Sequence, residues 1–273
     1  MRHASSPLLR TAFSALLLAA TLLAGGPAAA DLLVAPTRVQ FDEKTQSASV
    51  TLNNTAAEPR TYRVEFIEYT AQEDGSYLTP EQPRPDSVQL QRLLRYSPRQ
   101  VTLGPGESQS VRFLLRGGEA PQGEMRTHVR FVTIPPEAAP KDGEAKPAEG
   151  IQFDLKFALA VSIPVVYRPA GGSATAAIEA PTVVAAGEQK EIRFAIARTG
   201  TQSLYGDCEI VSGNDKVIGL LRGVAVYLEQ PRRSVRVPLD LAAKDPLPAG
   251  TRIRYRLPSD QGGTVLAEIP VGS

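Results

Sequence analysis

Short runs of alternating apolar and polar residues make up most of the chain after residue 30. Residues 48–53 form one such run, in which Val50 and Leu52 alternate with polar neighbours. Similar runs cover residues 62–68, 111–115, 128–134, 191–197, 205–211, 222–228, 234–239 and 251–257. A period of two places the apolar side chains on one face of a β-strand, and Gly, Pro, Asn and Asp separate the runs. The pattern predicts antiparallel β-sandwiches.

The longest run covers residues 151–167 and predicts a strand of unusual length. Its odd-numbered positions are apolar and would share one face. These positions are Phe153, Leu155, Phe157, Leu159, Val161 and Ile163. The run fits a long core strand of an ordinary sandwich, or a strand whose apolar row extends beyond its own sheet toward a partner.

Two segments around this run indicate how the chain is divided. Residues 136–150 are rich in Pro, Ala, Glu, Lys and Gly and predict a mobile loop that can become ordered on binding. Residues 167–173 have the composition of an interdomain linker, and about 100 residues follow, enough for a second sandwich. We therefore predict an all-β protein with two tandem immunoglobulin-like domains, residues 31–168 and 169–273.

The first 30 residues have the features of a cleaved signal peptide. Arg2 and Arg10 precede an apolar run over residues 11–23, and three alanines end the segment at Ala30. The apolar run is too short for a stable membrane span, so no stable membrane insertion is expected. The sequence predicts export across the inner membrane, with a mature chain that begins at Asp31.

Charge and cysteine content narrow the function classes. The chain has 30 Lys and Arg against 29 Asp and Glu, and two of the arginines lie in the predicted leader, so the mature protein is near neutral. This balance does not suggest nucleic-acid binding. Cys208 is the single cysteine, which rules out an internal disulfide and a two-cysteine metal site.

No sequence motif indicates catalysis. His128 is the one histidine after the leader and lies in an alternating run, where a sheet-surface role is expected. Cys208 lies between two acids, which favour the protonated thiol, and we interpret it as structural. No catalytic or nucleotide-binding signature appears, so we expect a binding protein with no cofactor and no metal. An exported adhesin or surface-binding module and an exported hydrolase remain alternatives.

Several segments resemble the periplasmic pilus-assembly (fimbrial) chaperones. Residues 35–39 (APTRV) are similar to the family's first-strand motif, and residues 98–112 to its P-x-x-x-x-L-x-P-G-x-x-Q-x-V-R signature. Residues 134–136 (IPP) and 163–169 (IPVVYRP) resemble a strand-ending motif and a domain-boundary motif. The resemblance is good over the first predicted domain and weak over the second.

The resemblance implies a function and its partners. Such chaperones bind pilus subunits whose immunoglobulin-like fold lacks a strand, fill the gap with their own long strand, and deliver the subunits to an outer-membrane usher. This donor-strand complementation is a form of β-augmentation. It would place the protein in the periplasm with its two domains in an L or boomerang arrangement. An exposed donor strand also makes self-association plausible.

The resemblance also implies site residues. The family anchors the subunit's terminal carboxylate with two basic residues, of which the first matches Arg38. The second, a lysine, is replaced here by Pro164, and Arg126 is a candidate substitute. An interdomain charge cluster matches Glu124, Arg168 and Asp260 by position, and should fix the angle between the domains.

Overall fold

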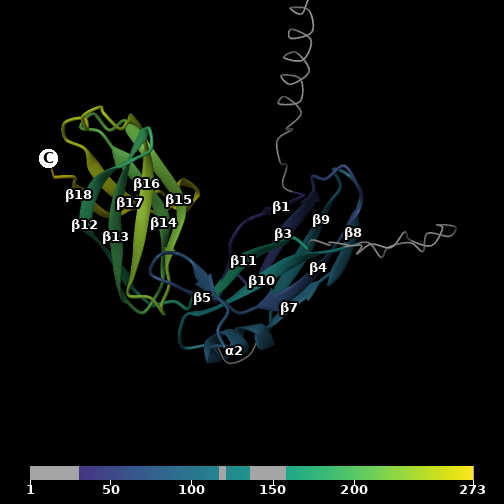
Figure 1. Cartoon of the computed structure of the whole chain (residues 1–273). Helices are drawn as coiled ribbons and strands as arrows, with labels where there is room; N and C mark the ends of the chain where they lie inside the picture. The colour runs from purple at the N-terminus through teal and green to yellow at the C-terminus, as the bar shows by residue number, and fades with distance from the viewer. Residues whose placement is uncertain (1–30, 117–120, 136–157, 273) are drawn as a thin grey trace, which may run out of the picture.

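The computed structural model describes residues 31–116, 121–135 and 158–272. The predicted signal peptide therefore lies outside the described residues, as do the loop predicted over 136–150 and the first part of the predicted donor strand. Two β-sandwiches follow one another along the chain, and Figure 1 shows them as two lobes that meet at an angle. The prediction of an all-β protein with two tandem sandwiches in a boomerang arrangement is confirmed.

The first sandwich packs a four-stranded sheet against a five-stranded one. The four-stranded sheet has the order β1 (Leu32–Ala35), β3 (Ser47–Asn54), β9 (Ser108–Leu115) and β7 (Leu94–Ser97). The five-stranded sheet has the order β2 (Val39–Phe41), β11 (Ala160–Tyr167), β10 (Met125–Ile134), β4 (Arg60–Ile67) and β8 (Gln100–Leu103). Alternate residues face the core between the sheets, where Phe41, Phe113 and Phe131 are fully buried.

The second sandwich has its own core. One sheet has the order β12 (Ala174–Ala186), β13 (Gln189–Gly200) and β16 (Arg232–Ala242), and the other has β15 (Val217–Val226), β14 (Leu204–Val211), β17 (Arg252–Arg256) and β18 (Val265–Pro270). Cys208 is fully buried in this core, and burial raises the pKa of its thiol to about 12. The predicted domain boundary after Arg168 falls in the short segment between the two cores.

A small hairpin of the first sandwich contacts the second. Strands β5 (Thr70–Ala71) and β6 (Tyr77–Leu78) form a separate two-stranded sheet, and Figure 1 places β5 beside the junction of the lobes. The Ser234 N–H donates to the Glu73 carbonyl at 2.7 Å, and Ala71 packs with Ala225 and Tyr227. The hairpin therefore helps to hold the two domains together.

A short helix, α2 (Pro85–Leu93), interrupts the strands and was not predicted. Pro85 occupies its first turn, where a missing N–H costs no hydrogen bond, and Asp86 and Arg92 suit the dipole at its two ends. Ser87 and Leu90 are its buried residues, so its apolar stripe is too weak to stand out in the sequence. Among the residues that the structure describes, no helix is long and apolar enough to cross a membrane.

Candidate functional site

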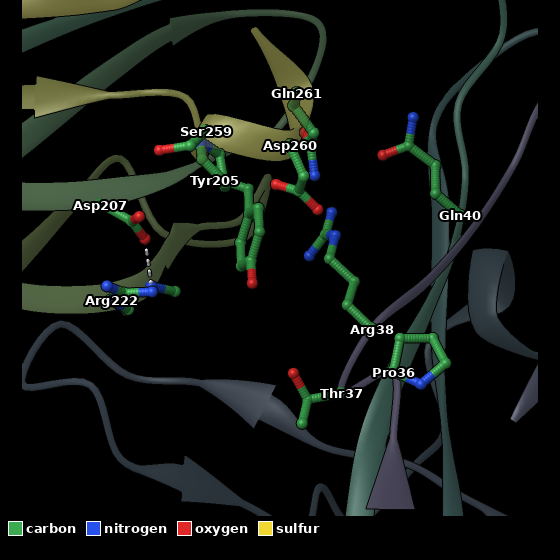
Figure 2. Close-up of a pocket in the computed structure, with 12 residues that line it drawn as sticks. Pro36, Thr37, Arg38, Gln40, Tyr205, Asp207, Arg222, Ser259, Asp260 and Gln261 are labelled. Carbon is green, nitrogen blue, oxygen red and sulfur yellow. Dashed lines mark hydrogen bonds between the residues drawn. The ribbon is translucent and has the colours of Figure 1, made fainter. Parts of the chain in front are cut away.

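A cavity of about 610 Å³ lies between the two domains (Figure 2). The N-terminal domain contributes Pro36, Thr37, Arg38 and Gln40 to its lining. The C-terminal domain contributes Tyr205, Asp207, Arg222, Gly223 and the residues 258–261 around the 3-10 turn η1 (Ser259–Gln261). Because both domains line it, the shape of the cavity depends on the angle between them.

Arg38 is the cation of the N-terminal wall. It follows β1 in the short connection to β2, and its guanidinium lies 4.6 Å from the centre of the Tyr205 ring. Its two terminal nitrogens are buried and have no hydrogen-bond partner among the described residues. A buried donor without an acceptor is costly, so an anion that reached these nitrogens would gain charge-assisted hydrogen bonds. Arg38 thus lies on the wall of the interdomain cavity, and its role as an anchor stays a prediction.

Arg126 does not share this cavity, and its predicted role as the second anchor is contradicted by its contacts. Its side chain is 4% exposed and forms an ion pair with Glu229 of the C-terminal domain. It also donates to the Tyr69 carbonyl at 3.2 Å and stacks 3.8 Å from the centre of the Tyr227 ring. Both terminal nitrogens of Arg126 are thus engaged, its charge is paired with Glu229, and its buried Nε is the one donor of the group without a partner among the described residues. These contacts, outside the cavity, do not fit a second anchor for a ligand carboxylate.

Arg126 belongs instead to an interdomain ion network that the sequence did not reveal. Glu229 also forms an ion pair with Arg84 at 3.0 Å, and its carboxylate accepts a hydrogen bond from the Ala71 N–H at 3.2 Å. Arg84 in turn lies 3.1 Å from Glu68, whose pKa is raised by burial. Glu229 therefore joins two arginines and the hairpin of the first domain to the second domain.

His128 is buried beside this network and remains neutral. Burial and then the nearby charges of Arg126, Arg84 and Arg38 lower its pKa to about 2. Its Nε2 lies 3.2 Å from the Arg126 guanidinium, which can only donate, so Nε2 accepts the hydrogen bond. Its ring packs edge-on against Tyr69 and Tyr77. The predicted sheet-surface histidine is thus a packed residue of the domain junction.

Two of the three residues predicted for an interdomain charge cluster do meet. Arg168 donates to Glu124 at 3.0 Å and to the Ser203 carbonyl at 2.8 Å, and the Ser203 N–H donates back to Glu124. Asp260 makes no ion pair with Arg168 in the described ranges; it lines the cavity together with Arg38. Asp260 lies on η1, which follows β17 and brings it to the cavity rather than to Ser203.

We expect Arg168→Ala to destabilise the protein by about 1–3 kcal/mol, because it leaves the buried Glu124 carboxylate without its cation. Asp260→Asn is the matched control and should change the free energy of unfolding by less than about 0.5 kcal/mol. Urea unfolding at neutral pH measures both values. Equal destabilisation by the two substitutions would contradict the assignment of Glu124 and Arg168 alone to this cluster.

The structure describes the apolar row of the predicted donor strand from Leu159 onward. The exposure of its side chains increases from Ile163 toward Leu159. Ile163 is 2% exposed and packs in the core of its own domain, so its side chain is not available to a partner, contrary to its predicted role. Val161 is partly buried against the same core, and Leu159 is 58% exposed. Phe153, Leu155 and Phe157 lie outside the described residues.

Strand β11 has an open edge at the same end. It pairs with β10 along its whole length, but the parallel pairing with β2 covers only Val165 to Tyr167. Within the described part of the chain, the second edge of residues 160–164 therefore has no neighbouring strand. An open edge with an exposed apolar side chain is a surface that another strand can extend.

Comparisons with known proteins identify the family. Residues 31–173 match the family described as "Pili and flagellar-assembly chaperone, PapD N-terminal domain". No curated protein sequence matches the chain. One similar solved structure is the YadV chaperone, with 12% sequence identity and a TM-score of 0.44, over 89% of this chain and 100% of that one. A second is the Pseudomonas aeruginosa CupB2 chaperone, with 13% identity and a TM-score of 0.46, over 88% of this chain and 100% of that one. A third is the Salmonella enterica SafA pilin in complex with the SafB chaperone, with 16% identity and a TM-score of 0.42, over 91% of this chain and 99% of that one. Because the family match covers more than half of the chain, the protein belongs to the family of pilus and flagellar-assembly chaperones.

Proposed function

We propose that the protein is a periplasmic chaperone that binds a pilus or fimbrial subunit by donor-strand complementation and delivers it to an outer-membrane usher. The open edge of β11 carries this proposal. A subunit that lacks a strand exposes an apolar groove and unpaired backbone groups, and an added strand covers both. The family resemblance assigns the donor strand to the run that ends in β11, which supports the proposal.

The hydrogen bonds of β11 indicate which backbone groups a subunit would use. The Thr133 N–H donates to the Leu159 carbonyl, so the odd-numbered residues of β11 direct their backbone groups toward β10. The even-numbered residues direct their backbone groups to the other edge. In agreement with this, the Arg168 N–H donates to the Phe41 carbonyl of β2. Ala160 and Ser162 therefore direct their backbone groups to the open edge, where no strand of the described part of the chain pairs with them.

Pro164 supports this assignment. It is the next even-numbered residue, and its missing N–H falls on the open edge rather than in the ladder with β10. Proline is tolerated in a sheet at such edge positions. It also limits the donor edge, because a partner strand receives no hydrogen bond from residue 164. The proposed donor segment thus starts near residue 153 and ends before Pro164.

The donor row and the cavity would act on different parts of the subunit. Leu159 and Val161, together with Phe153, Leu155 and Phe157 upstream, would fill the subunit's apolar groove. Arg38 would hold the carboxylate at the end of the subunit chain, since its terminal nitrogens lack acceptors. The same open edge would allow two free chaperones to self-associate.

Co-expression with subunits encoded by neighbouring reading frames, followed by co-purification, tests the proposal. We expect Ser162→Pro to reduce the captured subunit at least about tenfold, because it removes an N–H from the open edge and places a proline ring against the partner strand. Ser162→Ala is the matched control: it changes the side chain, keeps the N–H, and should capture subunit as the wild type does.

The free protein should tolerate both substitutions, since the Ser162 N–H faces the open edge and takes no part in the pairing with β10. Circular dichroism and urea unfolding check that the two variants are folded. Equal capture by Ser162→Pro and Ser162→Ala would show that β11 does not pair with the subunit, and would overturn the proposal.

A further inference from the structure

The interdomain cavity holds charges of both signs, which a site for a simple anion does not require. Arg38 and Arg222 are its cations, and Asp207 and Asp260 are its carboxylates. Figure 2 shows Asp260 facing Arg38 from the opposite domain, yet no ion pair joins the two within the 4.0 Å limit for such a contact. The two opposite charges thus face each other without a direct ion pair.

Asp207 has a structural task that sets it apart from Asp260. At a β-bulge, Arg222 and Gly223 of β15 together oppose Asp207 of β14, and Gly223 takes a positive φ of 69°. The Asp207 carboxylate accepts the Gly223 N–H at 2.9 Å and so holds this bulge in place. Asp260 accepts no hydrogen bond among the described residues and is exposed. Asp260 is therefore the carboxylate that remains available to a ligand.

Arg38 and Asp260 together define the chemistry of a ligand. The buried terminal nitrogens of Arg38 lack acceptors and favour a carboxylate. The Asp260 carboxylate on the facing wall repels that same anion unless the ligand also brings a positive charge. A ligand with both charges satisfies both walls, whereas an uncharged side chain leaves Asp260 without a partner.

We propose that this cavity selects a peptide end in which a carboxylate, bound by Arg38, lies next to a basic side chain, bound by Asp260. This inference rests on the proposed function and specifies the class of subunit terminus that the chaperone accepts. Asp260 becomes a specificity-determining residue, because it separates basic from neutral termini. Pro258 precedes η1, and two glycines with positive φ, Gly262 and Gly263, follow it. These residues fix the position of Asp260 on the turn.

Two isosteric probes test the proposal on the full mature chain. N-acetyl-lysine carries a carboxylate and an ammonium group, and N-acetyl-norleucine has the same carboxylate on an uncharged side chain of similar length. We expect the wild type to bind N-acetyl-lysine about two- to fivefold more tightly, the range set by partly exposed ion pairs. Titrations followed by NMR chemical shifts measure these weak affinities directly.

The substitution Asp260→Asn should change the two affinities in opposite directions. It removes the partner of the lysine ammonium group, so N-acetyl-lysine should bind more weakly, and it removes the repulsion of the carboxylate, so N-acetyl-norleucine should bind more tightly. Arg38→Gln should weaken both probes. Asp240→Asn, an exposed acid on β16 outside this cavity, is the matched control for the loss of one negative charge and should change neither affinity.

Two outcomes would overturn the inference. In the first, Asp260→Asn tightens both probes or changes neither, so that Asp260 does not recognise a basic group. In the second, Arg38→Gln leaves both affinities unchanged, so that the carboxylate binds elsewhere. Either result leaves the donor-strand proposal standing if Ser162→Pro still fails to capture the subunit. Equal capture by Ser162→Pro and Ser162→Ala would refute that proposal independently of the probes.

Discussion

Leu159→Glu is expected to abolish subunit capture while leaving the free protein folded. Leu159 is 58% exposed at the end of β11, where the side chain contacts little of its own domain. A glutamate at this position stays in water in the free chaperone, and its effect on the free energy of unfolding should remain within about 0.5 kcal/mol. In the complex the same carboxylate would enter an apolar groove, which costs several kcal/mol and corresponds to a loss of about 100-fold or more.

Leu114→Glu provides the matched control. Leu114 is also an exposed leucine of the N-terminal domain, 44% exposed, but it lies on β9 in the other sheet. Co-purification of the subunit should be normal with Leu114→Glu and absent with Leu159→Glu, and urea unfolding should give similar stabilities for both. Normal capture by Leu159→Glu would show that the exposed end of β11 does not enter the subunit.

The apolar row of β11 shows what an alternating pattern can predict and where it stops. In the described part of the run, residues 159–167, the odd-numbered residues share one face, as strand geometry alone requires. The pattern could not predict where along the row the core ends. Ile163 is buried and Leu159 is exposed, although the two have similar hydrophobicity and the same position in the repeat. That boundary depends on how far the facing sheet extends, which is a property of the tertiary fold.

The charged residues were harder to assign because long-range pairing leaves no local signal. Arg38 lies in the connection between β1 and β2, which the first-strand motif covers, and it lines the cavity, while its role as an anchor stays a prediction. Arg126 was chosen as a second anchor for its cation, but its partner Glu229 is 103 residues away in the chain. Nothing in the sequence around either residue indicates this pair. Asp260 was likewise matched to a cluster by position, and η1 instead brings it to the cavity that Arg38 also lines.

The ion network at the domain junction explains why the cavity can have a fixed shape without a disulfide. The hairpin β5–β6, Arg84 and Arg126 all reach Glu229, while Arg168 joins Glu124 to Ser203. These contacts cross between domains at separate points, and buried charge pairs are directional. The angle between the domains, and with it the distance between Arg38 and Asp260, is therefore set by polar contacts as well as by packing.

We expect Glu229→Ala to cost about 2–4 kcal/mol of stability, the largest loss among the interdomain ion pairs. Arg84 keeps Glu68 and Asp86 as neighbours when Glu229 is removed. Arg126 has no other carboxylate within ion-pair distance among the described residues, and its side chain is 4% exposed, so it becomes a buried cation without a counter-charge. Urea unfolding of residues 31–273 at neutral pH measures the loss.

Two further variants separate this mechanism from a general weakening of the interface. Glu73→Ala removes an exposed ion pair with Arg232 that also joins the hairpin to the C-terminal domain, and it should cost no more than about 1 kcal/mol. Adding Arg126→Met to Glu229→Ala should recover part of the lost stability, because the buried charge is removed and an apolar side chain of similar length can pack against Tyr227. If the double variant were less stable than Glu229→Ala alone, the unpaired charge of Arg126 would not be the cause of the loss, and Glu229 would act through its hydrogen bond to Ala71 instead.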